Sequence, residues 1–152
     1  MATSELSHTF VVYIRSSIDR VWKAVTDAKF TQQYFFGATV TSDWKPGSPI
    51  VYTIPEEDGG ERIAVEGKII ECTPMTRLSH TFTFPSFNED YSRVTYELEE
   101  MEDMVRLTLL HDDFPEDSKI YNQVQKGWPW LISGLKSVLE TGEALPQPKK
   151  WK

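Results

Sequence analysis

Three stretches in the middle of this sequence alternate between apolar and polar residues, and this pattern limits the fold more than any other feature. They are residues 77–84, 92–100 and 104–111. Successive side chains of a β-strand point to opposite faces of its sheet, so each stretch predicts a strand with one apolar and one polar face. Strands of this kind form a sheet whose apolar face must be covered by another element.

A long amphipathic helix near the C-terminus is the predicted cover. Pro129 lacks the backbone N–H that a helix interior uses, so we expect a kink or break near Gly127 to Pro129. Gly142 is placed to end the helix in a left-handed cap. The apolar residues that recur at helical spacing are Tyr121, Val124, Trp128, Leu131, Ile132, Leu135, Val138 and Leu139.

The first half of the chain predicts two short helices after an initial strand. Ser16 or Ser17 can cap the first helix. The second helix is expected after Asp27 and ends near Gly37. The apolar stripe of the first helix comprises Ile18, Val21, Trp22 and Val25. The predicted strands, with those named above, lie at about 9–14, 38–43, 49–55, 61–72, 77–84, 92–100 and 104–111.

This order of elements predicts an α+β protein in which helices cover one face of a sheet. A curved, seven-stranded antiparallel sheet would surround the long C-terminal helix, with the two short helices after the first strand. A length of 152 residues suits one domain over residues 1–152. Residues 146–152 contain two prolines and the basic string KKWK, and we expect them to form a flexible tail.

Charge and cysteine content exclude several classes of partner. The formal net charge of −7 repels phosphate backbones, so no nucleic-acid partner is expected. Cys72 is the single cysteine, the N-terminus has no signal-peptide pattern, and a cytoplasmic protein is predicted. No apolar run approaches the ~20 residues that span a bilayer, so we expect a soluble protein, and we expect it to be a monomer.

Motifs that carry catalytic or cofactor chemistry are missing from the sequence. It has no G-x-S-x-G string, no G-x-G-x-x-G string and no pair of histidines at helical spacing. We therefore predict no metal, no cofactor and no catalytic residue, and we expect Cys72 to be an inert thiol. Whether any catalysis occurs is left open.

The inward face of the predicted sheet supplies a candidate ligand pocket. Gly67 and Gly134 stand at inner positions where they would leave space for a cavity. His80 and His111 share the inward phase, and each is either a core histidine with a buried partner or a polar contact for a ligand. Trp128 is either a packing anchor or a gate. The predicted pocket residues are His80, Phe82, Tyr96, Leu107, Leu109, His111, Tyr121, Val124, Trp128, Leu131 and Leu135.

Three stretches of the sequence also resemble a known family. They are IDRVWKAVTD at 18–27, VEGKIIECTPMTRLSHTF at 65–82, and the set SRVTYELEE, VRLTLLHDDF and GWPWLISGLKSVLETGEAL between residues 92 and 145. The sequence resembles the START-like (SRPBCC, birch-pollen-allergen-like) superfamily. Within it, the chain is most similar to the C-terminal domain of activators of the heat-shock protein 90 ATPase.

The resemblance implies the helix-grip fold and three hypotheses for function. The first is that an apolar or aromatic small molecule, such as a lipid, binds between the sheet and the C-terminal helix, with a stress-related role. The second is a co-chaperone module that acts on a heat-shock protein 90 homologue through the outer face of the sheet. The third is a cyclase or dehydratase that uses His80, His111 or Tyr96 as acid or base. A fold of this kind supports many activities, so the site must decide among them.

Overall fold

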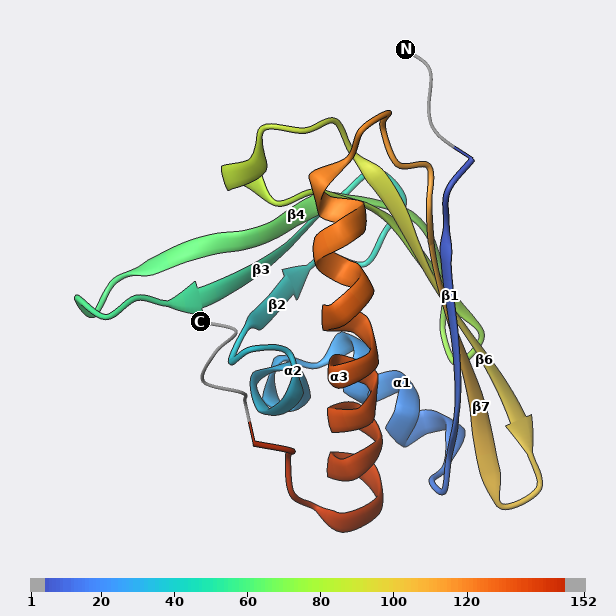
Figure 1. The fold of residues 1–152 in the computed structure, drawn as a ribbon. Coiled ribbons are helices and arrows are strands. Elements are labelled where there is room, and N and C mark those ends of the chain that lie inside the picture. Colours follow the sequence, from blue (N-terminus) through green and yellow to red (C-terminus); the bar gives the residue numbers. More distant parts are fainter. Residues whose placement is uncertain (1–4, 147–152) are drawn as a thin grey trace.

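The computed structural model describes residues 5–146, which form the predicted strands and helices in the predicted order (Figure 1). The predicted tail at residues 146–152 lies outside the described residues, except for Pro146. The elements are β1 His8–Ile14, α1 Ile18–Thr26, α2 Ala28–Tyr34, β2 Thr39–Ser42, β3 Pro49–Pro55, β4 Glu61–Thr73, β5 Arg77–Phe82, the 3₁₀ turn η1 Pro85–Phe87, β6 Ser92–Met101, β7 Met104–Asp112 and α3 Lys119–Thr141.

The seven strands form one antiparallel sheet in the order β1-β7-β6-β5-β4-β3-β2, so the predicted helix-grip fold is confirmed. Register shifts between Tyr52 and Thr53 and between Ile69 and Glu71 bend the sheet at β3 and β4. Figure 1 shows α3 crossing the sheet between the arm of β2, β3 and β4 and the arm of β1, β7 and β6. The first strand thus lies beside the last one, and α3 covers the sheet's apolar face.

The predicted alternation of faces is confirmed in β7, whereas Ser79 on β5 and Thr95 on β6, both assigned to the polar face, are buried and hydrogen-bonded to each other. Leu78, Val94, Leu107 and Leu109 are completely enclosed, while Thr108 between the last two is partly exposed. The strand β5 ends at Phe82 rather than at residue 84, because the chain turns there into η1. This inner face and the buried side of α3 form one hydrophobic core.

The two glycines that were expected to leave space allow close contacts instead. A Cβ atom on Gly67 would lie 1.8 Å from the carbonyl oxygen of Thr81, so only glycine lets β4 approach β5 at this point. A Cβ atom on Gly134 would lie 3.4 Å from the Cβ of Tyr34, where α3 packs against α2. Neither position is the origin of a cavity.

The expected break in α3 is absent. The helix runs without interruption from Lys119 to Thr141, with Pro129 inside it, so a new helical segment does not begin at Pro129. Pro129 has no N–H to donate to the carbonyl of Gln125, four residues earlier in the helix. Both residues are exposed. Water can reach that carbonyl, which explains how a regular helix tolerates the proline. The helix ends at Gly142 in the left-handed conformation with φ 84°, as predicted.

The short helices are also close to the prediction. The helix α1 follows Ser17, and the side chain of Asp27 accepts a hydrogen bond from the backbone N–H of Lys29 at the start of α2. Ala24, which the predicted stripe omitted, is buried on α1, whereas Trp22 is only partly buried. Within residues 5–146, no helix is both long enough and apolar enough to cross a membrane.

Candidate functional site

An open groove of about 830 Å³ lies beside the N-terminal half of α3. Its walls come from α3, the end of α2, the hairpin between β3 and β4, and the segment around η1. Figure 1 shows η1 and the β3–β4 hairpin on the same side of α3. The lining residues are Phe35, Phe36, Ala38, Ile54, Pro55, Glu56, Glu57, Asp58, Arg62, Ala64, Val65, Phe82, Phe84, Ser86, Phe87, Gln123, Val124, Gly127, Trp128 and Leu131.

Aromatic side chains in mutual contact form the floor of this groove. The ring of Trp128 meets the ring of Phe35 edge to face at 6.1 Å and lies 6.0 Å from that of Phe82. The rings of Phe84 and Phe82 are 5.3 Å apart, and those of Phe84 and Phe87 are 5.1 Å apart. Such a surface suits flat apolar or aromatic molecules, because rings stack or meet edge to face at these distances.

The mouth of the groove is acidic. Glu56, Glu57 and Asp58 stand at the tip of the β3–β4 hairpin, and Arg62 is the one cation among the groove-lining residues that the structure describes. The Nε atom of Arg62 lies 3.1 Å from Oε1 of Glu56, so its charge is already paired. The potential at the mouth is therefore negative and disfavours an anionic ligand.

A single glutamate ties the wall around η1 to α3. One carboxylate oxygen of Glu89 accepts a hydrogen bond of 2.7 Å from the hydroxyl of Ser118. The other accepts from the backbone N–H groups of Lys119 at 2.7 Å and of Ile120 at 3.3 Å. These are unpaired donors of the first turn of α3, and a carboxylate there also favours the helix dipole. Glu89 thus fixes the spacing between two walls of the groove.

Behind the groove floor, His111 has a partner on each ring nitrogen. The indole N–H of Trp128 donates to Nδ1 at 2.9 Å, so Nδ1 carries no proton. The Nε2–H can then donate to the hydroxyl of Ser92 at 2.7 Å, and that hydroxyl donates to the carbonyl of Phe82 at 3.1 Å. Burial holds the pKa of His111 well below its usual range, with smaller contributions from His8 and His80. His111 is a neutral core histidine that anchors Trp128.

His80 is also buried, but only one of its nitrogens has a partner. Its Nδ1 lies 2.7 Å from the carbonyl oxygen of Thr81, which can only accept, so Nδ1 carries the proton. Its Nε2 has no hydrogen-bond partner among residues 5–146. Burial lowers the pKa of His80 to about 4, against a small opposing effect of the Thr81 carbonyl. Burial also raises the pKa of the neighbouring Tyr52 and Tyr96, so this region is uncharged at neutral pH.

The structure divides the predicted pocket residues into three groups. Phe82, Val124, Trp128 and Leu131 line the groove. Tyr121 lies apart from it, stacked on His8 at 4.1 Å and edge to face with Phe114. The remaining predicted residues are buried in the core behind the groove: His80, Tyr96, Leu107, Leu109, His111 and Leu135.

The prediction missed the groove residues that come from loops. The tip of the β3–β4 hairpin was interpreted only as a turn and residues 85–90, with Phe87, only as a loop, whereas Phe84 was placed in the predicted strand 77–84. A signal for the second segment was present, because aromatic residues in a loop are expected to pack on something. Phe35 and Phe36 were assigned to the end of the second short helix, and the contact of their segment with α3 could not be foreseen.

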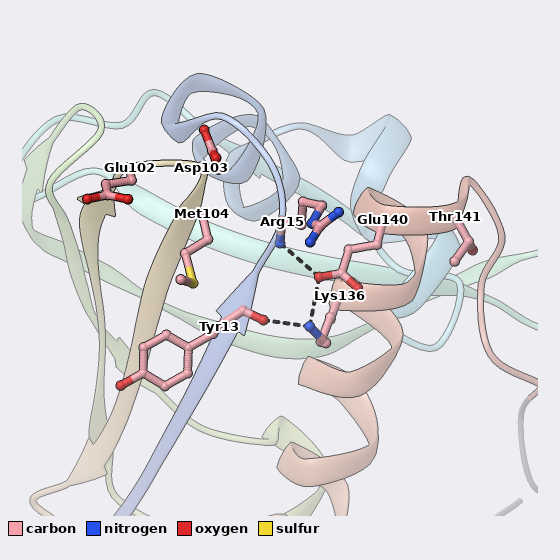
Figure 2. A pocket seen from close by; sticks show the side chains of 8 residues that line it. All are labelled: Tyr13, Arg15, Glu102, Asp103, Met104, Lys136, Glu140 and Thr141. Carbon is pink, nitrogen blue, oxygen red and sulfur yellow. Dashed lines mark hydrogen bonds and ion pairs between the residues drawn. The ribbon is translucent and has the colours of Figure 1, made fainter.

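A second groove of about 700 Å³, lined mainly by charged residues, lies at the other end of α3 (Figure 2). Lys136 donates from Nζ to the carbonyl of Tyr13 at 2.6 Å and to Glu140 at 2.7 Å. The same carboxylate of Glu140 accepts from the backbone N–H of Arg15 at 2.8 Å, and these bonds lower its pKa. Figure 2 shows this pair bridging α3 and the end of β1. It fixes the helix against the edge strand and covers polar backbone groups there.

Cys72 and the candidate metal ligands are the remaining reactive groups that the sequence analysis considered. Cys72 is partly buried near the end of β4, and burial raises the pKa of its thiol, which disfavours the reactive thiolate. In the part of the chain that the structure describes, no three His, Cys, Asp or Glu side chains gather as metal ligands.

Solved structures with the same architecture come from several organisms. CalU16 from Micromonospora echinospora matches with a TM-score of 0.73 and 22% identity over 94% of this chain and 78% of CalU16. The Aha1 dimer from Colwellia psychrerythraea matches with 0.72 and 16% over 91% of this chain and 99% of that one. An HSP90 activator from Plasmodium falciparum matches with 0.71 and 21% over 88% and 95%. The TM-scores show that this chain shares the fold of these proteins.

Sequence comparison extends this likeness to the family level. Among curated proteins, no sequence matches the chain. The family model described as "Activator of Hsp90 ATPase homolog 1-like protein" matches residues 15–140, which run from the end of β1 almost to the end of α3. The chain therefore belongs to the family of Activator of Hsp90 ATPase homolog 1-like proteins.

Proposed function

We propose that the protein binds an apolar or aromatic small molecule in the groove beside the N-terminal half of α3. The observation that carries this proposal is the continuous aromatic floor of Phe35, Phe82 and Trp128 in a groove of about 830 Å³. Binding pockets for small molecules are typically concave, largely apolar and of about this volume, roughly 300 to 1,000 Å³. The polar residues are confined mainly to the mouth.

The expected affinity is modest. Burial of roughly 300 Å² of ligand surface at about 25 cal/mol per Å² contributes about 7 kcal/mol before the entropic cost of association. Dissociation constants from micromolar to millimolar follow. The groove is open to solvent, so binding should be permissive toward ligand shape.

Gly127 offers a sharp way to test the site. It lies in the wall of the groove, and a Cβ atom placed on it would meet nothing within 4 Å. Gly127→Leu should therefore fill the groove without disturbing the fold, and leucine also favours the helix. Lys126→Leu is the matched control, since Lys126 is an exposed neighbour on α3 outside the groove lining.

The assay is a titration with naphthalene, followed by ¹H–¹⁵N NMR spectra of each variant. The wild-type protein and Lys126→Leu should show shifts at groove residues such as Val124 and Leu131, and Gly127→Leu should show at least tenfold weaker binding. Equal binding by all three proteins, or shifts only on the outer face of the sheet, would place the site elsewhere.

Co-chaperone activity on a heat-shock protein 90 homologue is the second candidate, because the family match supports it. Its surface would be the outer face of the sheet, where Val11 and Tyr13 are half-exposed on β1. An ATPase assay with the chaperone separates the two candidates. Co-chaperone action predicts acceleration that Val11→Glu removes and Gly127→Leu leaves intact, and an unchanged ATPase rate with the wild-type protein counts against it.

A further inference from the structure

The buried Nε2 atom of His80 is an acceptor without a donor. The proton of the neutral imidazole is on Nδ1, which donates to the carbonyl of Thr81, so Nε2 presents a lone pair. The residue is 1% exposed, and no donor for Nε2 exists among the described residues. Buried polar atoms are nearly always hydrogen-bonded, and a ligand is one partner that satisfies such an atom.

Aromatic contacts connect His80 with the groove floor. The ring of His80 lies 6.4 Å from those of Tyr52 and Phe82. Tyr52 stacks on Phe35 at 4.4 Å, while Phe82 lies beside Trp128. Phe35, Phe82 and Trp128 all line the groove. The unpaired acceptor is thus one aromatic layer away from the ligand site proposed above.

Within this layer, Phe35 is the side chain best able to move. The indole of Trp128 is fixed by its hydrogen bond to His111. Phe35 instead follows the last residue of α2, and the next two residues, Phe36 and Gly37, have φ angles of 54° and 76°. The backbone N–H of Phe35 caps α2 through the carbonyl of Thr31, so the movement needed is a rotation of the Phe35 side chain, which leaves that hydrogen bond in place.

The charges between the mouth of the groove and His80 limit the kind of ligand that can bind. The mouth carries Glu56, Glu57 and Asp58, and the charge of Arg62 is already paired with Glu56. At the inner end, the imidazole of His80 is neutral, since its pKa of about 4 keeps it unprotonated at pH 7. A carboxylate would find no cation to pair with, and an unpaired buried charge is costly.

We propose that the ligand is an uncharged aromatic alcohol or phenol whose hydroxyl donates to Nε2 of His80. Its ring takes the place of Phe35 against Tyr52, and the remainder of the molecule occupies the groove. This inference rests on the proposed small-molecule function and narrows its ligand class to neutral hydroxylated aromatics. Hydrocarbons would fill the groove without the hydrogen bond, and carboxylates would be rejected.

Three probes of nearly equal size separate these classes: naphthalene, 2-naphthol and 2-naphthoate. By isothermal titration calorimetry, the wild-type protein should bind 2-naphthol about tenfold more tightly than naphthalene, as one buried hydrogen bond allows. The 2-naphthoate should bind most weakly. In His80→Leu the advantage of naphthol over naphthalene should disappear, while naphthalene binds as before.

Equal binding of naphthol and naphthalene by the wild-type protein would overturn the inference, as would a naphthol advantage that persists in His80→Leu. If instead the groove is not the binding site, naphthalene binding will be insensitive to Gly127→Leu. Phe35→Ala should accelerate naphthol association, and an unchanged rate would contradict the displacement of Phe35.

A measurement on the wild-type protein covers the case in which His80→Leu does not fold. The ¹⁵N resonance of an unprotonated imidazole nitrogen moves upfield when that nitrogen accepts a hydrogen bond. Saturation with 2-naphthol should therefore shift the Nε2 resonance of His80 upfield, and saturation with naphthalene should not. An Nε2 resonance that responds identically to both probes would refute the assignment.

Discussion

Lowering the pH from 7 to 5 should destabilise the folded protein through His80. Its pKa is about 4 in the folded state, compared with an ordinary value of 6.5. The titratable groups near it are uncharged over this range, because burial raises the pKa of the Tyr52 and Tyr96 hydroxyls and lowers that of His111. No carboxylate is among these neighbours to stabilise an imidazolium ion. His80 therefore remains neutral in the folded chain while it takes up a proton in the unfolded chain.

The magnitude follows from these two values. Because the folded-state pKa is the lower one, the contribution to the free energy of unfolding is complete above pH 6.5 and decreases as the pH falls toward 4. Between pH 7 and pH 5 the linkage relation gives a loss of about 2 kcal/mol from His80. His111 should add a loss in the same direction, since its pKa is also lowered.

Urea denaturation of wild-type protein and His80→Leu at pH 7 and pH 5 isolates the effect. All carboxylates are common to both proteins, so their contributions cancel in the comparison. The loss of stability on acidification should be about 2 kcal/mol smaller in His80→Leu. Phe82→Leu, two residues along the same face of β5, is the control that should keep the wild-type pH dependence. Equal losses in wild type and His80→Leu would refute the buried neutral histidine.

Three further substitutions test the elements that position the groove, each by urea denaturation. Glu89→Ala removes the acceptor for two N–H groups of α3 and should lower the free energy of unfolding by about 1 to 2 kcal/mol; an unchanged value would mean that this cap contributes nothing. Trp128→Phe leaves Nδ1 of His111 buried without a donor and should cost about 1 to 3 kcal/mol, and a neutral effect would contradict the hydrogen-bond network. Pro129→Ala restores the N–H that the carbonyl of Gln125 lacks and should raise stability by up to about 3 kcal/mol, whereas a loss would show that the proline is required.

Much of the fold could be predicted because it depends on local periodicity. The alternation through Val94 and Leu107 identified the inner face of the sheet, and Gly142 identified the end of α3. The helix α1 shows the limit of this reasoning. Its apolar stripe was assigned through Trp22, but the small residue Ala24 faces the core and Trp22 lies only partly buried beside it. Helical spacing alone does not reveal which neighbour a stripe meets.

The groove could be predicted only in part, because its walls meet through contacts distant in sequence. Val124 and Trp128 on α3 were found from helical period. The wall around η1 depends on Glu89 reaching Ser118, and no repeat or motif encodes that pairing. Which ring nitrogen of His80 is left unpaired likewise depends on which one meets a carbonyl, and only the three-dimensional structure reveals this.

Intermolecular nuclear Overhauser effects test the central claim most directly, namely that a small aromatic molecule binds beside the N-terminal half of α3. With ¹³C-labelled protein and unlabelled naphthalene, cross-peaks are expected from the ligand protons to the side chains of Phe82, Val124 and Leu131, which share the groove. Cross-peaks to Val11 and Tyr13 on the outer face of β1, with none to the three groove residues, would contradict the claim.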